Sequence, residues 1–244
     1  MPTITSCYNI EKDAINRREA VNRSTNWTWY TNMDYEAQII FQKITWIPFR
    51  ESMEILIPFL EKRYNENHEE IDESAKEIKI KLDTQKNQIF ELMGKLTKRP
   101  IFNENFQIRY TTCQRWPYNW ETWEIRIMEP SKKEFRYKYR TKSFIHELLH
   151  FQTHKYYENI PPMNKLDKQQ FNLLKESLTF LINYEFPEIN KGTDNGYPQH
   201  QEFRKILENH RISLWDKKDF EKLIEFWCNK ILNNISQKTK ILNF

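Results

Sequence analysis

Hydrophobic positions in the first hundred residues recur mostly at intervals of three and four, the spacing of one face of an α-helix. The charged stretch from Ile10 to Asn22 fits a helix, and a second helix is expected from Asp34 to Lys43. A third helix begins near Pro48 and ends near Tyr64, and a fourth runs from Asn67 to about Lys95. Residues 1–100 are therefore predicted to form a helical N-terminal region or subdomain.

After Pro100 the pattern changes from helical spacing to strict alternation. Phe106–Thr111, Trp123–Ile127 and Phe135–Tyr139 each alternate apolar and polar residues, and turn-forming sequences separate them. Three short strands in this order predict a small antiparallel meander. Together with the helices on either side, it indicates an α+β fold that is mostly helical.

Helical spacing returns at Ser143, a suitable N-cap for a helix that continues to about Tyr157. A second helix is expected from Asp167 to Glu185, followed by a loop rich in Gly and Asn. Two further helices are predicted, one from about Pro198 to Asn209 and one from Asp216 to about Asn233. Residues 101–244 thus form the second predicted region, with the sheet before the helices.

The helix that begins at Ser143 contains the pattern His-Glu-x-x-His, formed by His146, Glu147 and His150. Residues four apart lie on the same helix face, so both imidazoles can reach one metal ion. Glu147 is offset by about 100° around the helix, where it can take a proton from water at the metal without itself acting as a ligand. Apolar residues border this face and are expected to bury the rest of the helix.

His146-Glu147-Leu148-Leu149-His150 resembles the active-site helix of the zincin metallopeptidases. The resemblance implies that the two histidines bind Zn²⁺ and that Glu147 is the general base. In zincins a small sheet precedes this helix, and its edge strand holds an extended peptide. The order of elements here is consistent with that arrangement, so the expected substrate is a peptide or a protein.

A catalytic zinc takes three protein ligands, so one more is needed. Glu176 is our choice, because it lies on the next predicted helix, 26 positions after His150. This layout resembles the gluzincins, whose glutamate ligand follows on a later helix, and its spacing is similar to that of the ImmA/IrrE-like peptidases. Asp194 and His200 remain alternatives for the third ligand.

Other residues near the motif are candidates for supporting roles. His154 is a further turn along the helix, too far to share one ion with His146. The metzincin pattern is not met, because Thr153 stands where it requires glycine. Peptide deformylases use a cysteine ligand before the motif; Cys113 is the only candidate, and it lacks their surrounding signature and their glycines. Tyr197 and His200 are the candidates for stabilising the oxyanion, with Tyr156 and Tyr157 as weaker ones.

Composition narrows the functional classes further. The chain has a net charge of +4, and its lysines are scattered among glutamates, which argues against nucleic-acid binding. Only three glycines occur in 244 residues, so no glycine-rich phosphate loop exists. No apolar run approaches the ~20 residues that span a bilayer, and the N-terminus has no secretory signal. The three cysteines are far apart, which favours a reducing, cytoplasmic setting.

The sequence thus predicts a zinc-dependent hydrolase, most simply a metallopeptidase in which Glu147 activates water at a zinc held by His146, His150 and Glu176. The alternative is a non-catalytic metal-binding or protein-interaction module that keeps a zincin-like fold. Glu147 distinguishes the two, because a purely structural zinc site does not require it. Nothing in the sequence indicates the oligomeric state.

Overall fold

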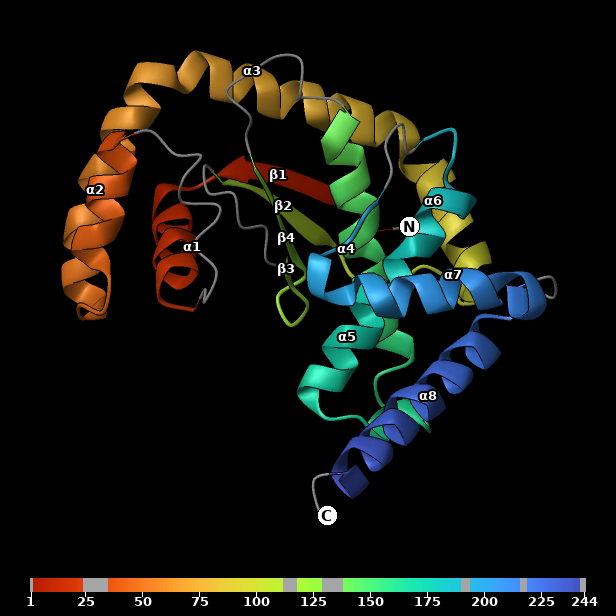
Figure 1. Ribbon diagram of the computed structural model, residues 1–244. Coiled ribbons are helices and arrows are strands. Elements are labelled where there is room, and N and C mark those ends of the chain that lie inside the picture. The colour runs from red at the N-terminus through yellow and green to blue at the C-terminus, as the bar shows by residue number, and fades with distance from the viewer. Residues whose placement is uncertain are drawn as a thin grey trace. The chain divides into compact units, whose positions relative to one another are not determined.

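The computed structural model describes residues 2–23, 35–111, 118–128, 138–189, 194–215 and 219–241 (Figure 1). The fold is α+β and mostly helical, as the sequence predicted. The α-helices are α1 (Ile10–Arg23), α2 (Tyr35–Ile44), α3 (Phe49–Thr97), α4 (Lys138–Tyr156), α5 (Lys168–Leu178), α6 (Ile182–Glu185), α7 (Gln201–Trp215) and α8 (Phe220–Ile241). The strands are β1 (Ile4–Tyr8), β2 (Phe106–Thr111), β3 (Tyr118–Asn119) and β4 (Glu124–Met128). Among the described residues, none of the helices combines the length and apolar composition needed to cross a bilayer.

Contacts divide the chain into two units whose sequences interleave. The sheet unit comprises Pro2–Asp83 and Glu104–Arg140, and the helical unit comprises Thr84–Asn103 and Thr141–Phe244. This division differs from the expected boundary near residue 100. The N-terminal segment joins the sheet unit because β1 pairs with β2, while the last turns of α3 pack in the helical unit.

The sheet is mixed, with strand order β1-β2-β4-β3. β2 lies parallel to both β1 and β4, and only β3 and β4 are antiparallel, so the predicted antiparallel meander is wrong. The reason is a tight turn after β3, where the Asn119 side chain accepts hydrogen bonds from the backbone N–H groups of Glu121 and Thr122. This turn sends β4 back between β2 and β3. Of the third predicted strand, residues 135–137 lie outside the described residues, and Lys138 and Tyr139 belong to α4.

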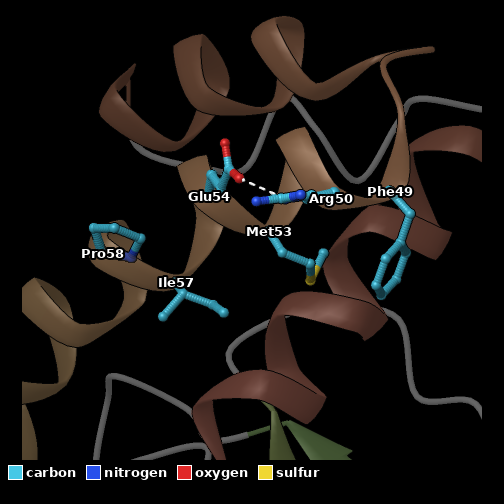
Figure 2. A pocket seen from close by; sticks show the side chains of 6 residues that line it. All are labelled: Phe49, Arg50, Met53, Glu54, Ile57 and Pro58. Carbon is cyan, nitrogen blue, oxygen red and sulfur yellow. Dashed lines mark hydrogen bonds and ion pairs between the residues drawn. The ribbon is translucent and has the colours of Figure 1, made fainter.

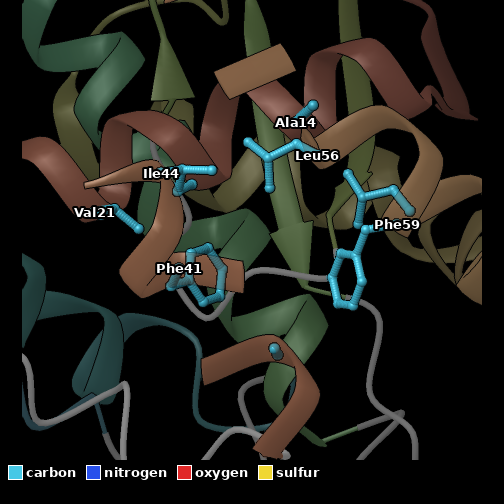
Figure 3. Packing of buried hydrophobic residues seen from close by; sticks show 8 residues of the cluster. Ala14, Val21, Phe41, Ile44, Leu56 and Phe59 are labelled. Carbon is cyan, nitrogen blue, oxygen red and sulfur yellow. The ribbon is translucent and has the colours of Figure 1, made fainter. Parts of the chain in front are cut away.

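One face of the sheet is apolar. Ile108, Ile125 and Ile127 are buried on this face, as their alternation predicted. Tyr110 on the same face donates from its hydroxyl to the Ala75 carbonyl of α3, over 3.0 Å. Helices α1, α2 and the first part of α3 share a separate apolar cluster, shown in Figure 3 and made of Ala14, Val21, Ala37, Phe41, Ile44, Leu56, Phe59 and Leu60.

Helix α3 is a single helix, whereas the sequence predicted two helices with a boundary between Tyr64 and Asn67. Polar side-chain pairs support the continuous helix in this polar stretch. The Tyr64 hydroxyl contacts the Asp72 carboxylate, and Lys79 pairs with Asp83 one turn further along. Close to the end of the helix, the Thr97 hydroxyl donates to the Met93 carbonyl.

In the helical unit, the sides of α4 that flank the motif are buried, as predicted from their apolar residues Phe144, Ile145, Leu148, Leu149 and Phe151. Two polar contacts attach α4 to the end of α3. The Tyr157 hydroxyl donates to the Thr97 carbonyl, and the Gln152 amide donates to the Thr97 hydroxyl over 3.1 Å. These contacts anchor the C-terminal part of the motif helix.

Candidate metal centre

The regular backbone of α4 brings His146 and His150 onto one face, as the four-residue spacing predicted. Their Nε2 atoms lie 3.0 Å apart, and the two rings stand nearly perpendicular with centroids separated by 4.5 Å. Both nitrogens therefore point to one place. His150 is fully buried there and His146 is mostly buried.

Helix α5 brings Glu176 to the same place. Asp167 begins this helix with a capping box, in which its side chain accepts from the backbone N–H of Gln170 and the Gln170 side chain accepts from the N–H of Asp167. Two turns later, the Glu176 carboxylate lies 3.4 Å from Nε2 of His146 through Oε2 and 3.4 Å from Nε2 of His150 through Oε1. The sequence predicted this proximity from the order of the helices.

These three side chains form the group in the described structure that could hold a metal ion. Zinc bonds of about 2.05 Å at tetrahedral angles separate neighbouring ligand atoms by about 3.3 Å. The observed separations of 3.0, 3.4 and 3.4 Å agree with that value. Two imidazoles and one carboxylate are also a known ligand set of catalytic zinc. The residues therefore fit such an ion.

Glu147 lies beside this group and is not part of it. The residue is only 7% exposed, and its Oε2 is buried without a hydrogen-bond partner. Burial raises the pKa of Glu147 to about 7, with the neighbouring carboxylate of Glu176 adding to the rise. A buried carboxylate with an unsatisfied oxygen is costly unless a ligand or water completes it.

Asp194 contacts the opposite side of the His146 ring. Its Oδ2 lies 2.7 Å from His146 Nδ1, so the Nε2 atom of that ring is left to face Glu176 and His150. A carboxylate in this position fixes the ring orientation and the tautomer of a ligating histidine. The sequence left Asp194 as an alternative third ligand. Its carboxylate instead contacts Nδ1 of His146, the ring nitrogen that does not face Glu176 and His150.

The ionisation of the metal-free site follows from these contacts. Burial opposes charge on His146, but the hydrogen bonds with Asp194 and Glu176 prevail and raise its pKa to about 10. Burial lowers the pKa of His150 to about 3. Although burial opposes ionisation of both acids, the adjacent histidines hold the pKa of Glu176 well below its usual range, and His146 helps lower that of Asp194 to about 2. Without metal, the site therefore keeps a proton on His146.

Lys175 is a buried cation beside the metal donors that the sequence did not predict. It precedes Glu176 on α5, and its ammonium lies 3.5 Å from Oε1 of Glu176. Burial lowers the pKa of Lys175, while Glu176 and Glu147 oppose that change. The signal available in the sequence was its place on the apolar stripe of α5, between the buried Leu174 and Leu178.

Tyr197 and His200, the predicted oxyanion-stabilising residues, follow Asp194 in the chain. Tyr197 is half-exposed, and its ring meets the His200 ring edge-on with centroids 5.7 Å apart. Nδ1 of His200 is buried without a hydrogen-bond partner, and burial lowers the pKa of His200 while Glu176 opposes the change. Neither residue belongs to the three-donor group identified among the described residues.

The remaining candidates have other surroundings. His154 pairs with Glu158 over 2.8 Å and packs against the Phe171 ring, in agreement with the spacing argument against it as a ligand. Tyr157 is buried with its hydroxyl on the Thr97 carbonyl, so it has a structural role. Cys113 lies outside the described residues.

An apolar hollow lies elsewhere, at the start of α3 in the sheet unit (Figure 2). Its charged residues, Arg50 and Glu54, pair with each other over 3.1 Å and are largely exposed. The lining residues are Phe49, Arg50, Met53, Glu54, Ile57 and Pro58. Among the described residues that line this hollow, none is a buried titratable group, unlike the centre formed by α4 and α5.

The arrangement on α4 and α5 combines three metal donors, a buried carboxylate and a histidine-orienting aspartate. Comparison of the chain with protein-family models, with curated proteins and with solved structures finds no match.

Proposed function

We propose that this protein is a zinc-dependent hydrolase, and specifically a metallopeptidase of the zincin type. One observation supports this most strongly: a buried His₂Glu donor group has a second buried carboxylate, Glu147, directly beside it with one oxygen unsatisfied. A structural zinc site needs four protein ligands and no neighbouring base. A three-ligand site beside a base is typical of hydrolytic zinc enzymes.

In the proposed reaction, the metal ion would supply a Lewis acid and Glu147 would transfer the proton. His146, His150 and Glu176 would hold the zinc, which would supply a Lewis acid that polarises a carbonyl and lowers the pKa of water towards neutral pH. Glu147 takes the proton of the attacking water on its free Oε2 and returns it to the nitrogen of the leaving amine. Its burial suits this role, because burial raises the pKa of Glu147 and so makes the carboxylate a stronger base.

Two further roles belong to this proposal. Asp194 orients His146 through Nδ1, which keeps Nε2 directed at the ion. His200 is the candidate for stabilising the negative charge that develops on the carbonyl oxygen, since its Nδ1 is buried without a hydrogen-bond partner and the charge of Glu176 acts on its pKa. Tyr197 supports the His200 ring through their edge-on contact.

The test is a comparison of Glu147→Gln with the wild-type protein in two assays. Zinc per chain is measured by elemental analysis after reconstitution, and cleavage of a mixed peptide library is followed by mass spectrometry. We expect about one zinc per chain in both proteins and cleavage at least about 100-fold slower in the variant, the usual contribution of a general base. Glu202→Gln, an exposed change on α7, is the matched control and should behave as wild type.

Other outcomes separate the alternatives. His146→Ala and Glu176→Ala should each lose zinc, because each removes a ligand. Zinc in the wild type with no cleavage of any peptide would favour the non-catalytic metal-binding module. Failure of the wild type to bind zinc would exclude the hydrolase proposal.

A further inference from the structure

We propose that Arg204 is a positioning residue of the metal centre, whose guanidinium holds together the two segments that present Glu176 and Asp194. Arg204 is neither one of the proposed zinc ligands nor the proposed general base. The inference rests on the zinc site proposed above, and it adds a residue outside the His-Glu-x-x-His pattern on which metal affinity depends.

Arg204 lies near the start of α7, and only 5% of it is exposed. Its Nη1 donates to the main-chain carbonyl of Glu176 over 3.2 Å and to the Thr179 hydroxyl. Its Nη2 donates to the Asp194 carbonyl and lies 3.2 Å from Oδ1 of the Asp194 carboxylate. One planar group therefore bonds both to the helix that carries the third ligand and to the segment that carries the partner of His146.

The contacts of Asp194 show why the position of this segment matters. Its Oδ1 accepts from the Thr179 hydroxyl over 3.2 Å and from the Gly196 N–H over 3.0 Å. Asn183 fixes the backbone reciprocally, because Asp194 N–H donates to its side-chain oxygen and its amide donates to the Asp194 carbonyl. With Oδ1 engaged in this way, Oδ2 is directed at Nδ1 of His146. The orientation of the ligand thus depends on how the segment is held.

Gly196 provides the space for the guanidinium. Its φ of +61° is in the left-handed region, which glycine adopts without steric cost. A Cβ at this position would lie 2.8 Å from both Cδ and Nη1 of Arg204, closer than real Cβ contacts occur. An alanine here would displace the arginine from its four acceptors. In a chain with only three glycines, one is placed where Arg204 must approach the backbone.

If Arg204 formed only a structural salt bridge, its loss would have a different effect. The loss would lower the stability of the helical unit but would leave the affinity and geometry of the metal site unchanged. A positioning residue alters the metal itself, and loss of a group that orients a ligand typically weakens metal binding by about 10- to 100-fold. Metal affinity and the spectrum of a substituted metal therefore distinguish the two roles.

The experiment measures the zinc Kd of the full chain by competition with the chromophoric chelator 4-(2-pyridylazo)resorcinol. Cobalt(II) replaces zinc in parallel samples, and its visible absorption reports the ligand geometry. We expect Arg204→Met to bind zinc about 10- to 100-fold more weakly than wild type and to show an altered cobalt spectrum. Arg204→Lys should fall in between, because an ammonium keeps the charge and loses the fork of two nitrogens. Lys205→Met, an exposed loss of one positive charge on the same helix, should stay within about twofold of wild type.

Two further measurements cover the case in which Arg204→Met does not fold. Gly196→Ala keeps the arginine and should weaken zinc binding by displacing it. Arg204→Ala with added ethylguanidinium should regain part of the lost affinity. Unchanged zinc Kd and unchanged cobalt spectra in the folded Arg204 and Gly196 variants would overturn the inference while the metal site stands. Absence of zinc binding in the wild type would instead refute the proposed site, and this inference with it.

Discussion

Replacing Glu124 by glutamine tests how charge is arranged on the polar face of the sheet. Glu124 on β4 is only 6% exposed. Its carboxylate pairs with Arg126 on the same strand and with Arg109 on the adjacent strand β2. Oε1 accepts from Nε of Arg126 over 2.9 Å, and Oε2 accepts from Nε of Arg109. Glutamine keeps the size and one acceptor, but it removes the charge and turns an NH₂ donor towards one guanidinium.

The magnitude follows from these contacts. A hydrogen bond to a charged group contributes about 1.5–3 kcal/mol, and removing one partner of a fully buried ion pair costs about 3–5 kcal/mol. The arginine side chains retain 18% and 12% exposure, so water can replace part of what is lost. We therefore expect Glu124→Gln to lower the free energy of unfolding of the sheet unit by about 2–4 kcal/mol at pH 7.

The effect should depend on pH in a definite direction. Burial would raise the pKa of Glu124, but the guanidinium groups of Arg126 and Arg109 prevail and lower it. A carboxyl whose pKa is lowered in the folded state stabilises the protein above its unfolded pKa of about 4.3, and this contribution is lost as the pH falls through the folded value. The difference between wild type and variant should thus be full at pH 7 and should shrink below about pH 4.

The assay is hydrogen exchange of the β2 and β4 amides, combined with urea unfolding followed by circular dichroism between pH 7 and pH 3. Exchange reads the sheet unit directly, which matters because two units need not unfold in one step. Glu121→Gln, an exposed change three residues earlier, is the control and should have little effect. A difference under about 0.5 kcal/mol at pH 7, or one that is the same at pH 7 and pH 3, would refute the reasoning.

Two other predictions concern the metal centre and the helix that carries Glu176. His146 of the metal-free protein has a pKa of about 10 and must lose its proton to bind zinc, so binding at pH 7 should release about one proton or more. Calorimetry in buffers of different ionisation enthalpy counts these protons. Asp194→Asn should reduce the number, because Asp194 raises the pKa of His146. A count near zero for the wild type would contradict the assignment of His146 as a protonated ligand. Asp167→Ala removes the capping box of α5 and should lower stability by about 0.5–2 kcal/mol in urea unfolding, while Asp167→Asn should retain most of it; equal losses in the two variants would mean that the cap is not the cause.

Local patterns in the sequence predicted the part of the site that depends on helix geometry. His146 and His150 meet because any helix brings residues four apart onto one face, and the apolar residues between them are buried as expected. Glu176 required one further step, the packing of two consecutive helices, and the proximity of its carboxylate to both imidazoles agrees with that step. Both inferences used contacts close in sequence or between neighbouring elements.

The direction of the sheet could not be obtained in the same way. Alternation located β2 and β4 correctly, but it is identical for parallel and antiparallel strands. The sequence also showed no sign of β1, which pairs parallel to β2 from more than ninety positions away and whose five residues show little alternation. In Ile-Thr-Ser-Cys-Tyr the two polar residues stand next to each other, so a period of two did not mark the segment as a strand.

Asp194 and Arg204 show a different limit, because their roles come from contacts between segments that no periodicity relates. Asp194 lies 48 positions after His146, and nothing in its immediate sequence distinguishes a ligand from a group that orients one. The relevant sign was the rarity of glycine. Three non-glycine residues in the described structure, Trp46, Lys98 and Trp123, also have a positive φ, but Gly196 combines a positive φ with a close approach by Arg204 that a Cβ would block. Asp194, two positions before Gly196, contacts His146. Arg204 occupies the space where a side chain of residue 196 would lie, and it bonds to the helix of Glu176. Gly196 therefore marks, in the sequence, a segment that the hydrophobic periodicity of the chain does not distinguish.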